Sequence, residues 1–399
     1  MKLYKYSLPI IIVLIASITP IRLLMGHFSS YEYSLNKRQE IAKSDAPTID
    51  IAVASNNKHF GESFVRGADL ALEEENKIGF SFSKDISAPI QKKMVLHYFN
   101  EDKKNNKKMI SDIVSNTNIV ATISAQESSE AIDSSVLFEQ HGVLFLSTFA
   151  TDQHLTNHGF NYVFSSIPIA LDYAAALVKY CEIAKYKKVT YLYPRGSLGA
   201  LNFTVSFGTL LFNKDIHIHS SYSFNEKMED YRLIINKLAE KKPDAILLLA
   251  KGLTAAKMLN QLRSMGIETP VFGYIGLDDL DIWDAAKGKA YNTFVATTFK
   301  ANTEEDKKTA MYQAFYAKYG SYPNYLAVQG YDALKMLAAA IRKGNSSIPI
   351  NIAGSLKYNF KGLYKDYYFN SLGRIKNQSI KIKEMKNAEF YNVMDFGVE

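Results

Sequence analysis

The chain has 399 residues, of which 47% are hydrophobic and 22% charged, and it carries a formal net charge of +7 at neutral pH. This length fits two folded lobes better than one core, and the composition excludes an intrinsically disordered chain. Basic and acidic residues alternate along the sequence without a concentrated basic and aromatic face, so we expect no nucleic-acid partner. A single cysteine, Cys181, excludes an internal disulfide.

The N-terminus has the pattern of an export signal. Lys2 and Lys5 precede an apolar stretch that runs from Leu8 to Ile21. The stretch is shorter than the ~20 residues that span a membrane comfortably, which favours a signal peptide. No clear small-residue cleavage site follows, so a retained signal-anchor stays open as the alternative. We assign residues 1–26 to this signal peptide or signal-anchor.

Residues 27–47 are rich in Ser, Lys, Glu and Gln, which is typical of a linker. We expect this linker to join the N-terminal segment to a folded body. The body should then lie outside the cytoplasmic membrane, either in the periplasm or held at the outer face of that membrane.

Short apolar runs alternate with helical patterns through the body. The runs predict eight strands: 51–54, 94–99, 119–123, 143–146, 189–193, 245–250, 271–274 and 294–297. Such alternation is typical of βαβ units, in which a parallel sheet is covered by helices on both faces. The fold class is therefore α/β, with two doubly wound parallel sheets.

The first strand and the helix after it carry the most specific motif. Phe60-Gly61 lies between them, and the helix contains Gly67-Ala68 and ends in the acidic run Glu73-Glu74-Glu75-Asn76. This segment resembles the opening of periplasmic binding proteins of the branched-chain amino-acid type. Further matches in the same order extend the resemblance over residues 48–390.

The resemblance implies the type 1 periplasmic binding fold, in which the chain crosses between two lobes three times. Lobe one is then expected to hold residues 48–168 and 298–355. Lobe two is expected to hold residues 169–297 and 356–392. A small-molecule ligand would bind in the cleft between the lobes, where the carboxyl ends of the strands meet.

Two successive strand ends run through small hydroxyl residues into a helix or turn, at 123–129 and 146–151. Hydroxyls and unpaired backbone N–H groups at a helix start bind a carboxylate or another oxygen-rich group. Two ordinary helix caps are the alternative. The repetition of the same chemistry at both ends favours a ligand site.

The resemblance places a ligand carboxylate against a serine, a backbone amide and a threonine. In this sequence these are Ser128, the amide of Phe149 or Ala150, and Thr151. Phe149 replaces the small residue that is usual in the family, so it fills part of the ligand volume. His59 and Phe60 match the aromatic pair that walls the cleft from lobe one.

In lobe two the family pattern fails at the position that pairs with a ligand ammonium. Ile275 stands where an acidic residue is expected, and Asp278 or Asp279 reaches inward only if the loop is shifted. An ammonium buried without a counter-charge is costly. We therefore expect free branched-chain amino acids to bind poorly.

Three further residues are candidates for the lobe-two wall. Leu198 stands where an aromatic residue is common, and Arg195 and Lys251 follow strands of this lobe. If the two cations face the cleft, they favour a carboxylate-bearing ligand. Ordinary surface positions for both are the alternative.

The function expected from these residues is that of an exported solute-binding protein, which captures a small molecule and delivers it to an ABC-type permease. The alternative is a sensory module that reports ligand occupancy to a membrane receptor. No catalytic constellation, cofactor motif or complete metal-ligand set is present in the sequence. We therefore expect no enzymatic activity, no cofactor and no metal site.

Overall fold

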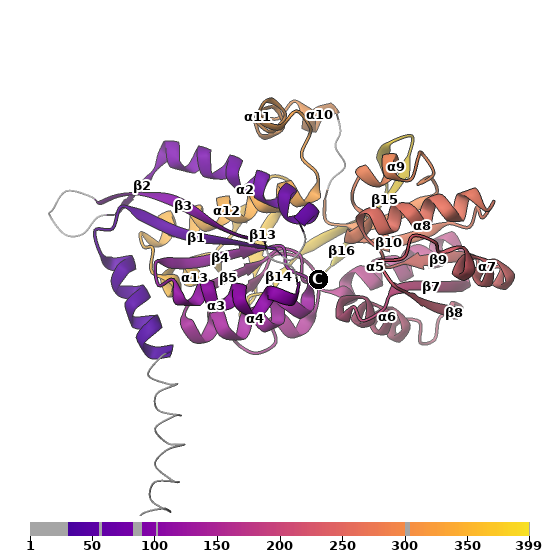
Figure 1. Ribbon diagram of the computed structural model, residues 1–399, viewed down its shortest axis with the longest axis horizontal. Coiled ribbons are helices and arrows are strands. Elements are labelled where there is room, and N and C mark those ends of the chain that lie inside the picture. Colours follow the sequence, from indigo (N-terminus) through magenta and orange to yellow (C-terminus); the bar gives the residue numbers. More distant parts are fainter. Residues whose placement is uncertain (1–30, 56–57, 83–89, 101–102, 300–303, 399) are drawn as a thin grey trace, which may run out of the picture.

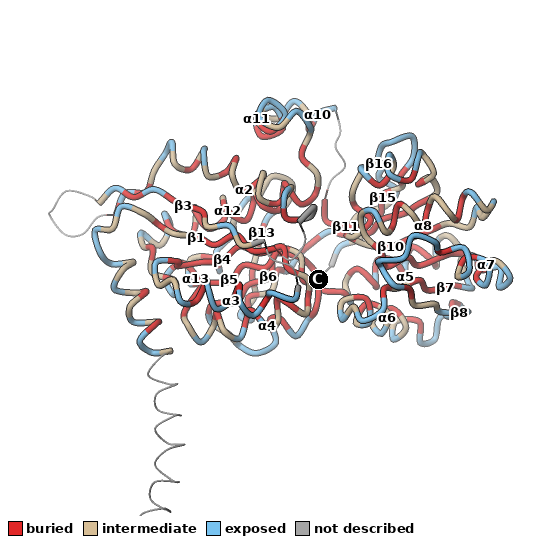
Figure 2. Tube along the Cα trace, viewed as in Figure 1, coloured by how far each residue is buried: buried red, intermediate tan, exposed pale blue. Residues whose placement is uncertain are grey.

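The described residues form two α/β lobes that lie side by side (Figure 1). The computed structural model describes residues 31–55, 58–82, 90–100, 103–299 and 304–398. Buried strands lie at the centre of each lobe, and the exposed positions gather on the helices around them (Figure 2). The arrangement confirms the α/β class with two doubly wound lobes.

Lobe one is built on a six-stranded sheet. In sheet order its strands are β2 (Phe80–Phe82), β3 (Ile90–Asn100), β1 (Thr48–Ser55), β4 (Ile119–Ser124), β5 (Leu144–Ser147) and β6 (Val163–Ser165). All neighbouring pairs are parallel except β2 with β3. Ile51 and Val53 pack in one core cluster with Phe64, whereas Ala52 and Ala54 pack in a second cluster on the opposite face. Burial on both faces explains why this strand is a continuous apolar run.

Lobe two is built on a seven-stranded sheet. Its order is β16 (Glu389–Val398), β15 (Gln378–Lys386), β11 (Thr293–Thr297), β10 (Val271–Tyr274), β9 (Ala245–Leu248), β7 (Lys188–Pro194) and β8 (His217–Phe224). The strands from β11 to β8 are parallel, and β15 and β16 add antiparallel at one edge. All eight strands predicted from apolar runs are present in the two sheets.

Helices cover both sheets. In lobe one they are α2 (Lys58–Ile78), α3 (Asn106–Ser115), α4 (Ser128–His141), α10 (Glu304–Lys307), α11 (Ala310–Tyr319), α12 (Tyr325–Gly344) and α13 (Pro349–Leu356). In lobe two they are α5 (Ala170–Ala184), α6 (Leu198–Leu210), α7 (Arg232–Lys241), α8 (Gly252–Ser264) and α9 (Asp281–Ala285). None of the described helices is long and apolar enough to cross a membrane. The apolar stretch from Leu8 to Ile21 lies outside the described residues.

A helix covers part of the segment expected to be a linker. Residues 31–43 are helical and dock on lobe one through Arg38, which is fully buried. Its guanidinium donates to the carbonyls of Ile119 and His141, each at 2.6 Å, and of Val114 at 3.1 Å. These bonds place a cation at the carboxyl ends of α3 and α4, where the helix dipoles favour it. The linker prediction is therefore wrong for residues 31–43.

The third crossing between the lobes lies later in the chain than expected. Residues 360–376 form a small sheet of β12 (Phe360–Lys361), β13 (Asp366–Phe369) and β14 (Ile375–Lys376), which we expected in lobe two. Asp332 of α12 accepts hydrogen bonds from the Leu363 amide at 3.1 Å and the Tyr367 hydroxyl at 2.9 Å. These contacts hold the small sheet on lobe one, so the chain crosses near Asn377.

Lys365 of this small sheet ties two other crossings together. Its ammonium donates to the Ser166 carbonyl at 3.1 Å and to the Thr298 hydroxyl at 3.4 Å. Ser166 follows β6 and Thr298 follows β11, so both belong to segments that join the lobes. Burial lowers the pKa of Lys365 to about 7, and the nearby charge of Asp332 offsets this in part.

The tightest helix contact joins α2 to α12. A methyl group at Gly67 would lie 1.8 Å from the Ala327 carbonyl oxygen, and one at Gly330 would lie 2.1 Å from that of Phe64. Each glycine thus permits a backbone approach that a side chain would block. The Gly67-Ala68 motif of the sequence is therefore a packing feature of lobe one.

We predict that Gly330→Ala lowers the free energy of unfolding by about 1–3 kcal/mol, because the helices must separate to admit the methyl group. Urea denaturation measures the change. The control is Gly354→Ala in α13, where an added methyl group meets no atom within 4 Å. An equal effect of the two substitutions would contradict the packing argument.

The low pKa of Lys365 predicts a pH dependence of stability. The unfolded chain keeps this lysine protonated up to its ordinary pKa near 10.5, whereas the folded protein releases the proton near pH 7. The folded state therefore gains stability as the pH rises from about 7 towards 10. Lys365→Met removes this gain, so the stability difference between wild type and variant should change over that range. Lys361→Met, at an exposed position in β12, should track the wild type; parallel curves for all three proteins would contradict the assignment.

Candidate functional site

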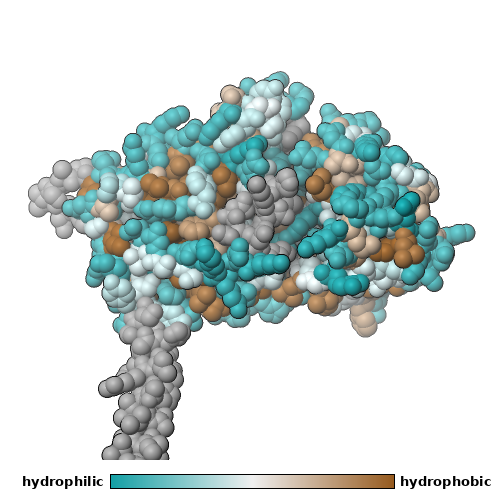
Figure 3. Space-filling view, in the orientation of Figure 1, coloured by the Kyte–Doolittle hydropathy of each residue, from teal (hydrophilic) through white to brown (hydrophobic). Residues whose placement is uncertain are grey.

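A cavity with a volume of about 180 Å³ lies where the two lobes meet. Its lobe-one wall comes from the start of α4 and the loop after β5, and its lobe-two wall from the starts of α6 and α8 and the end of β10. These are carboxyl ends of parallel strands, the place where α/β proteins bind ligands. In the view of Figure 3, which shows both lobes, most of the visible surface is hydrophilic.

Three predicted residues form the lobe-one wall. Ser128 is the first residue of α4, and Phe149 and Thr151 follow β5; all three line the cavity. A methyl group at Gly199 of α6 would lie 3.6 Å from the Ser128 hydroxyl. The starts of α4 and α6 therefore face each other across the cleft.

Three predicted residues also line the cavity from lobe two: Leu198, Lys251 and Ile275. Tyr274 lies beside them and stacks on Phe203, with 4.4 Å between the ring centroids. Burial raises the pKa of Tyr274 to about 12, and a hydrogen bond with Thr151 of lobe one limits the rise. The phenol is therefore neutral near pH 7 and contacts both lobes.

An ion pair joins the lobes at the cavity. The Lys251 ammonium contacts the Glu127 carboxylate, and both side chains are about four-fifths buried, with 19% of each exposed. Glu127 is the N-cap residue of α4 and Lys251 the N-cap residue of α8. A second polar contact between the lobes runs from the Asn202 amide to the Asp152 carboxylate.

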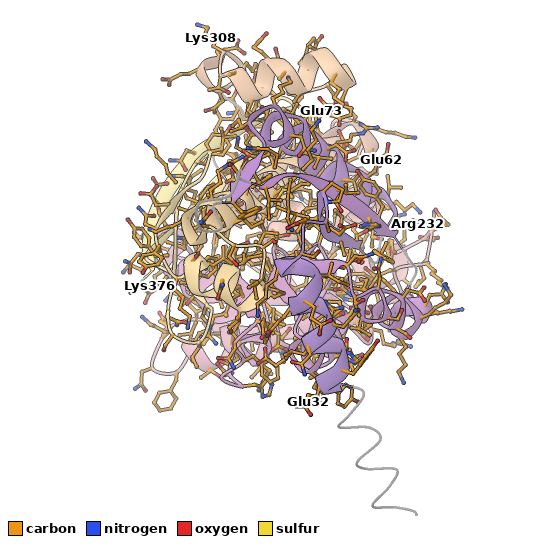
Figure 4. All side chains as sticks on the ribbon, turned by 90° about the vertical axis from the view of Figure 1, so that its left-hand side faces the viewer. Glu32, Glu62, Glu73, Arg232, Lys308 and Lys376 are labelled. Atoms are coloured by element: carbon orange, nitrogen blue, oxygen red, sulfur yellow. The ribbon has the colours of Figure 1, made fainter. Side chains whose placement is uncertain are left out.

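The cleft continues outward past this ion pair. Glu127, Glu226 and Lys251 line both the cavity and the outer cleft. The outer walls add Asp279, whose pKa is raised to about 6 by burial and by the neighbouring acids Asp281 and Asp278. Glu62 of α2, which is labelled in Figure 4, also lines the outer cleft.

Three predicted residues lie away from the cavity lining in the structure. Arg195 is exposed and does not line the cavity, and the Ala150 side chain packs in the lobe-one core. Asp278 is buried elsewhere, with its carboxylate 2.6 Å from the Lys383 ammonium of β15 and bonded to the Thr297 hydroxyl. The prediction that Asp278 or Arg195 faces the ligand is therefore wrong. Lys251 faces the cleft, but its charge is neutralised by Glu127. Neither Arg195 nor Lys251 therefore supports an anionic ligand.

His59 and Phe60 fall in the first turn of α2, and their side chains lie outside the described part of the chain. Their expected role stays a prediction.

Sequence reasoning missed three residues of the cleft: Glu127, Glu226 and Tyr274. Glu127 stands inside the hydroxyl-rich segment that was singled out, directly before the helix start. The negative charge of Glu127 could have been recognised in the sequence as unfavourable for a ligand carboxylate at Ser128, because like charges repel. Tyr274 ends a predicted strand and resembled a core residue, and no local pattern marks Glu226.

The sequence matches the family model of periplasmic binding proteins over residues 52–349. The chain belongs to the periplasmic binding protein family. This finding confirms the recognition made from the opening motif, and the two-lobe architecture agrees with it.

Two curated members of this family are similar to the chain. The leucine-, isoleucine-, valine-, threonine- and alanine-binding protein of Pseudomonas aeruginosa is 22% identical over 345 residues, which cover 85% of this chain and 90% of that protein. The leucine-specific-binding protein of Salmonella typhimurium is 24% identical over 234 residues, which cover 58% of this chain and 63% of that protein.

Solved structures of the family share the fold. The branched-chain amino acid transporter substrate-binding protein LivJ of Streptococcus pneumoniae, in complex with isoleucine, has a TM-score of 0.76 at 22% identity and covers 88% of this chain and 99% of its own. A solute-binding protein of an ABC transporter from R. palustris, in complex with benzoate, has a TM-score of 0.76 at 14% identity. The match covers 88% of this chain and 97% of that protein. The same fold therefore accommodates chemically different ligands.

Proposed function

We propose that the protein is an exported solute-binding protein, which captures a small molecule between its lobes and delivers it to an ABC-type importer. The observation that carries this proposal is the cavity lined from both lobes, by Ser128 and Thr151 on one side and Leu198 and Ile275 on the other. A ligand there contacts both lobes at once, so binding favours the closed arrangement. Membership of the family supports the role, as does the naming of relatives as transporter substrate-binding proteins.

The export signal of the sequence supports a location outside the cytoplasmic membrane. The apolar stretch from Leu8 to Ile21 is the candidate for any attachment to the membrane. Non-enzymatic binding fits the family and the absence of a catalytic constellation in the sequence.

The docking of residues 31–43 favours a second candidate, a tethered sensory module. If the apolar stretch ending at Ile21 is retained in the membrane, residues 22–30 alone separate it from a helix fixed to lobe one by Arg38. Lobe one would then be held close to the membrane while lobe two moves. Deletion of the gene separates the two roles, because a transporter mutant loses uptake of the ligand and a sensor mutant loses a response while uptake persists.

We predict that protein purified from exporting cells retains a small molecule in the cavity. Mass spectrometry of the denatured protein should detect a compound released by the wild type and absent from Leu198→Trp, because the indole fills the cavity that Leu198 lines.

Leu201→Trp is the matched control, because Leu201 lies on the same helix, is 55% exposed and does not line the cavity. It should release the same compound as the wild type. Identical compounds, or none, from all three proteins would contradict a binding function at this cleft.

A further inference from the structure

The cleft carries more negative than positive charge. Glu127, Glu130 and Glu226 line the cavity, and among the described lining residues Lys251 is the one basic side chain. The outer cleft adds Asp279 and further acids to these. Because a cavity between two low-dielectric walls weakens the screening of such charges, the sign of the excess selects the charge of a ligand.

The two basic residues that the structure describes in the cleft are already paired. Lys251 contacts Glu127, and Arg66 contacts Glu62 on the same helix. Among the residues that the structure describes, neither Glu226 nor Asp279 has an ion-pair partner, so this part of the cleft carries an excess of negative charge. An incoming cation therefore finds a partner, whereas an incoming anion does not.

A carboxylate of the protein lies next to the place expected for a ligand carboxylate, because Glu127 directly precedes Ser128 and both line the cavity. Glu127 is the N-cap residue of α4, but its side chain makes no capping hydrogen bond, and its carboxylate contacts Lys251 beside the helix start. A ligand carboxylate that approached Ser128 would meet this like charge. The same position thus repels carboxylates and attracts ammonium groups.

The remaining walls suit an organic cation. The aromatic residues Phe149 and Tyr274 line the cavity, and aromatic rings attract ammonium groups. Leu198 and Ile275 provide apolar surface for a hydrocarbon chain. Carboxylates combined with aromatic and aliphatic walls form a binding site for an amine.

We propose that the cleft binds a small organic amine without a carboxylate, whose cationic nitrogen lies between Glu127 of lobe one and Glu226 of lobe two. This inference rests on the proposed function of the cleft. Both glutamates line the junction of the cavity and the outer cleft, and the Lys251 ammonium occupies this region in the structure. Lys251 is thus an internal competitor of the ligand for Glu127.

The proposal gives the two members of one ion pair opposite effects on binding. Glu127→Gln removes the partner of the ligand cation and should weaken amine binding at least tenfold. Lys251→Met removes the competitor and should strengthen amine binding several-fold. A purely structural ion pair would change binding in the same direction whichever partner is lost.

Isothermal titration calorimetry at pH 7.5 tests this with three compounds that share one branched chain. These are 3-methylbutylamine, leucine and 4-methylpentanoate, which carry an amine, both groups and a carboxylate. The wild type should bind the amine most tightly. Lys257→Met, a change at a surface lysine of α8 that pairs with Glu229, is the control and should match the wild type.

Preference for leucine or the acid, or weaker amine binding by Lys251→Met in a variant with wild-type circular dichroism, would overturn the inference and leave the binding function in place. Binding of none of the three compounds would also overturn it. The binding function itself is decided separately, by the compound that the purified protein releases and that Leu198→Trp lacks.

Discussion

The contact between Glu127 and Lys251 joins the two lobes at the cleft. Each residue precedes a helix, and each comes from a different lobe, so the pair brings the start of α4 against the start of α8. Both charges are largely buried, and removing one partner from such a pair costs about 3–5 kcal/mol because the other charge remains without compensation. The closed cleft therefore depends on a pair whose members belong to the binding surface. A ligand that enters the cleft must either displace Lys251 from Glu127 or bind beside the intact ion pair.

The rest of the fold makes that contact possible by keeping each lobe rigid and confining motion to the crossings. Gly67 and Gly330 let α2 and α12 pack backbone to backbone, and Arg38 fixes the N-terminal helix to the ends of α3 and α4. Lys365 joins the crossings after β6 and β11 through Ser166 and Thr298. Hinge motion between rigid bodies is the expected consequence of this arrangement.

The sequence was sufficient to predict most of the strands that are buried and therefore apolar. Eight of the parallel strands appeared as continuous apolar runs and were predicted correctly, whereas the short parallel strand β6 was missed although it is buried. Strand β8, with the sequence HIHSSYSF, lies at the edge of its sheet and is mostly exposed, so it lacks that pattern. Residues 31–43 look like a polar linker because the group that anchors them is an arginine, and its carbonyl partners lie far along the chain.

The cleft could be predicted in part for the same reason. Ser128 and Thr151 were predicted from the hydroxyl-rich segments after two strands and from the family resemblance, and Lys251 because it lies just past a strand of lobe two. The pairing of charges is not local, so the sequence did not reveal that Glu127 neutralises Lys251 or that Lys383 withdraws Asp278 from the cleft. These two pairings remove the basis on which the sequence favoured an anionic ligand.

The distance between the lobes in solution tests the central claim, that the Glu127–Lys251 contact holds the cleft closed. Spin labels on cysteines introduced at the exposed positions Lys77 and Lys241, one in each lobe, report this distance by double electron–electron resonance in a Cys181→Ala background. The empty protein should give a narrow distribution, and Glu127→Gln should shift it to longer and broader distances. An unchanged distribution in Glu127→Gln would contradict the account.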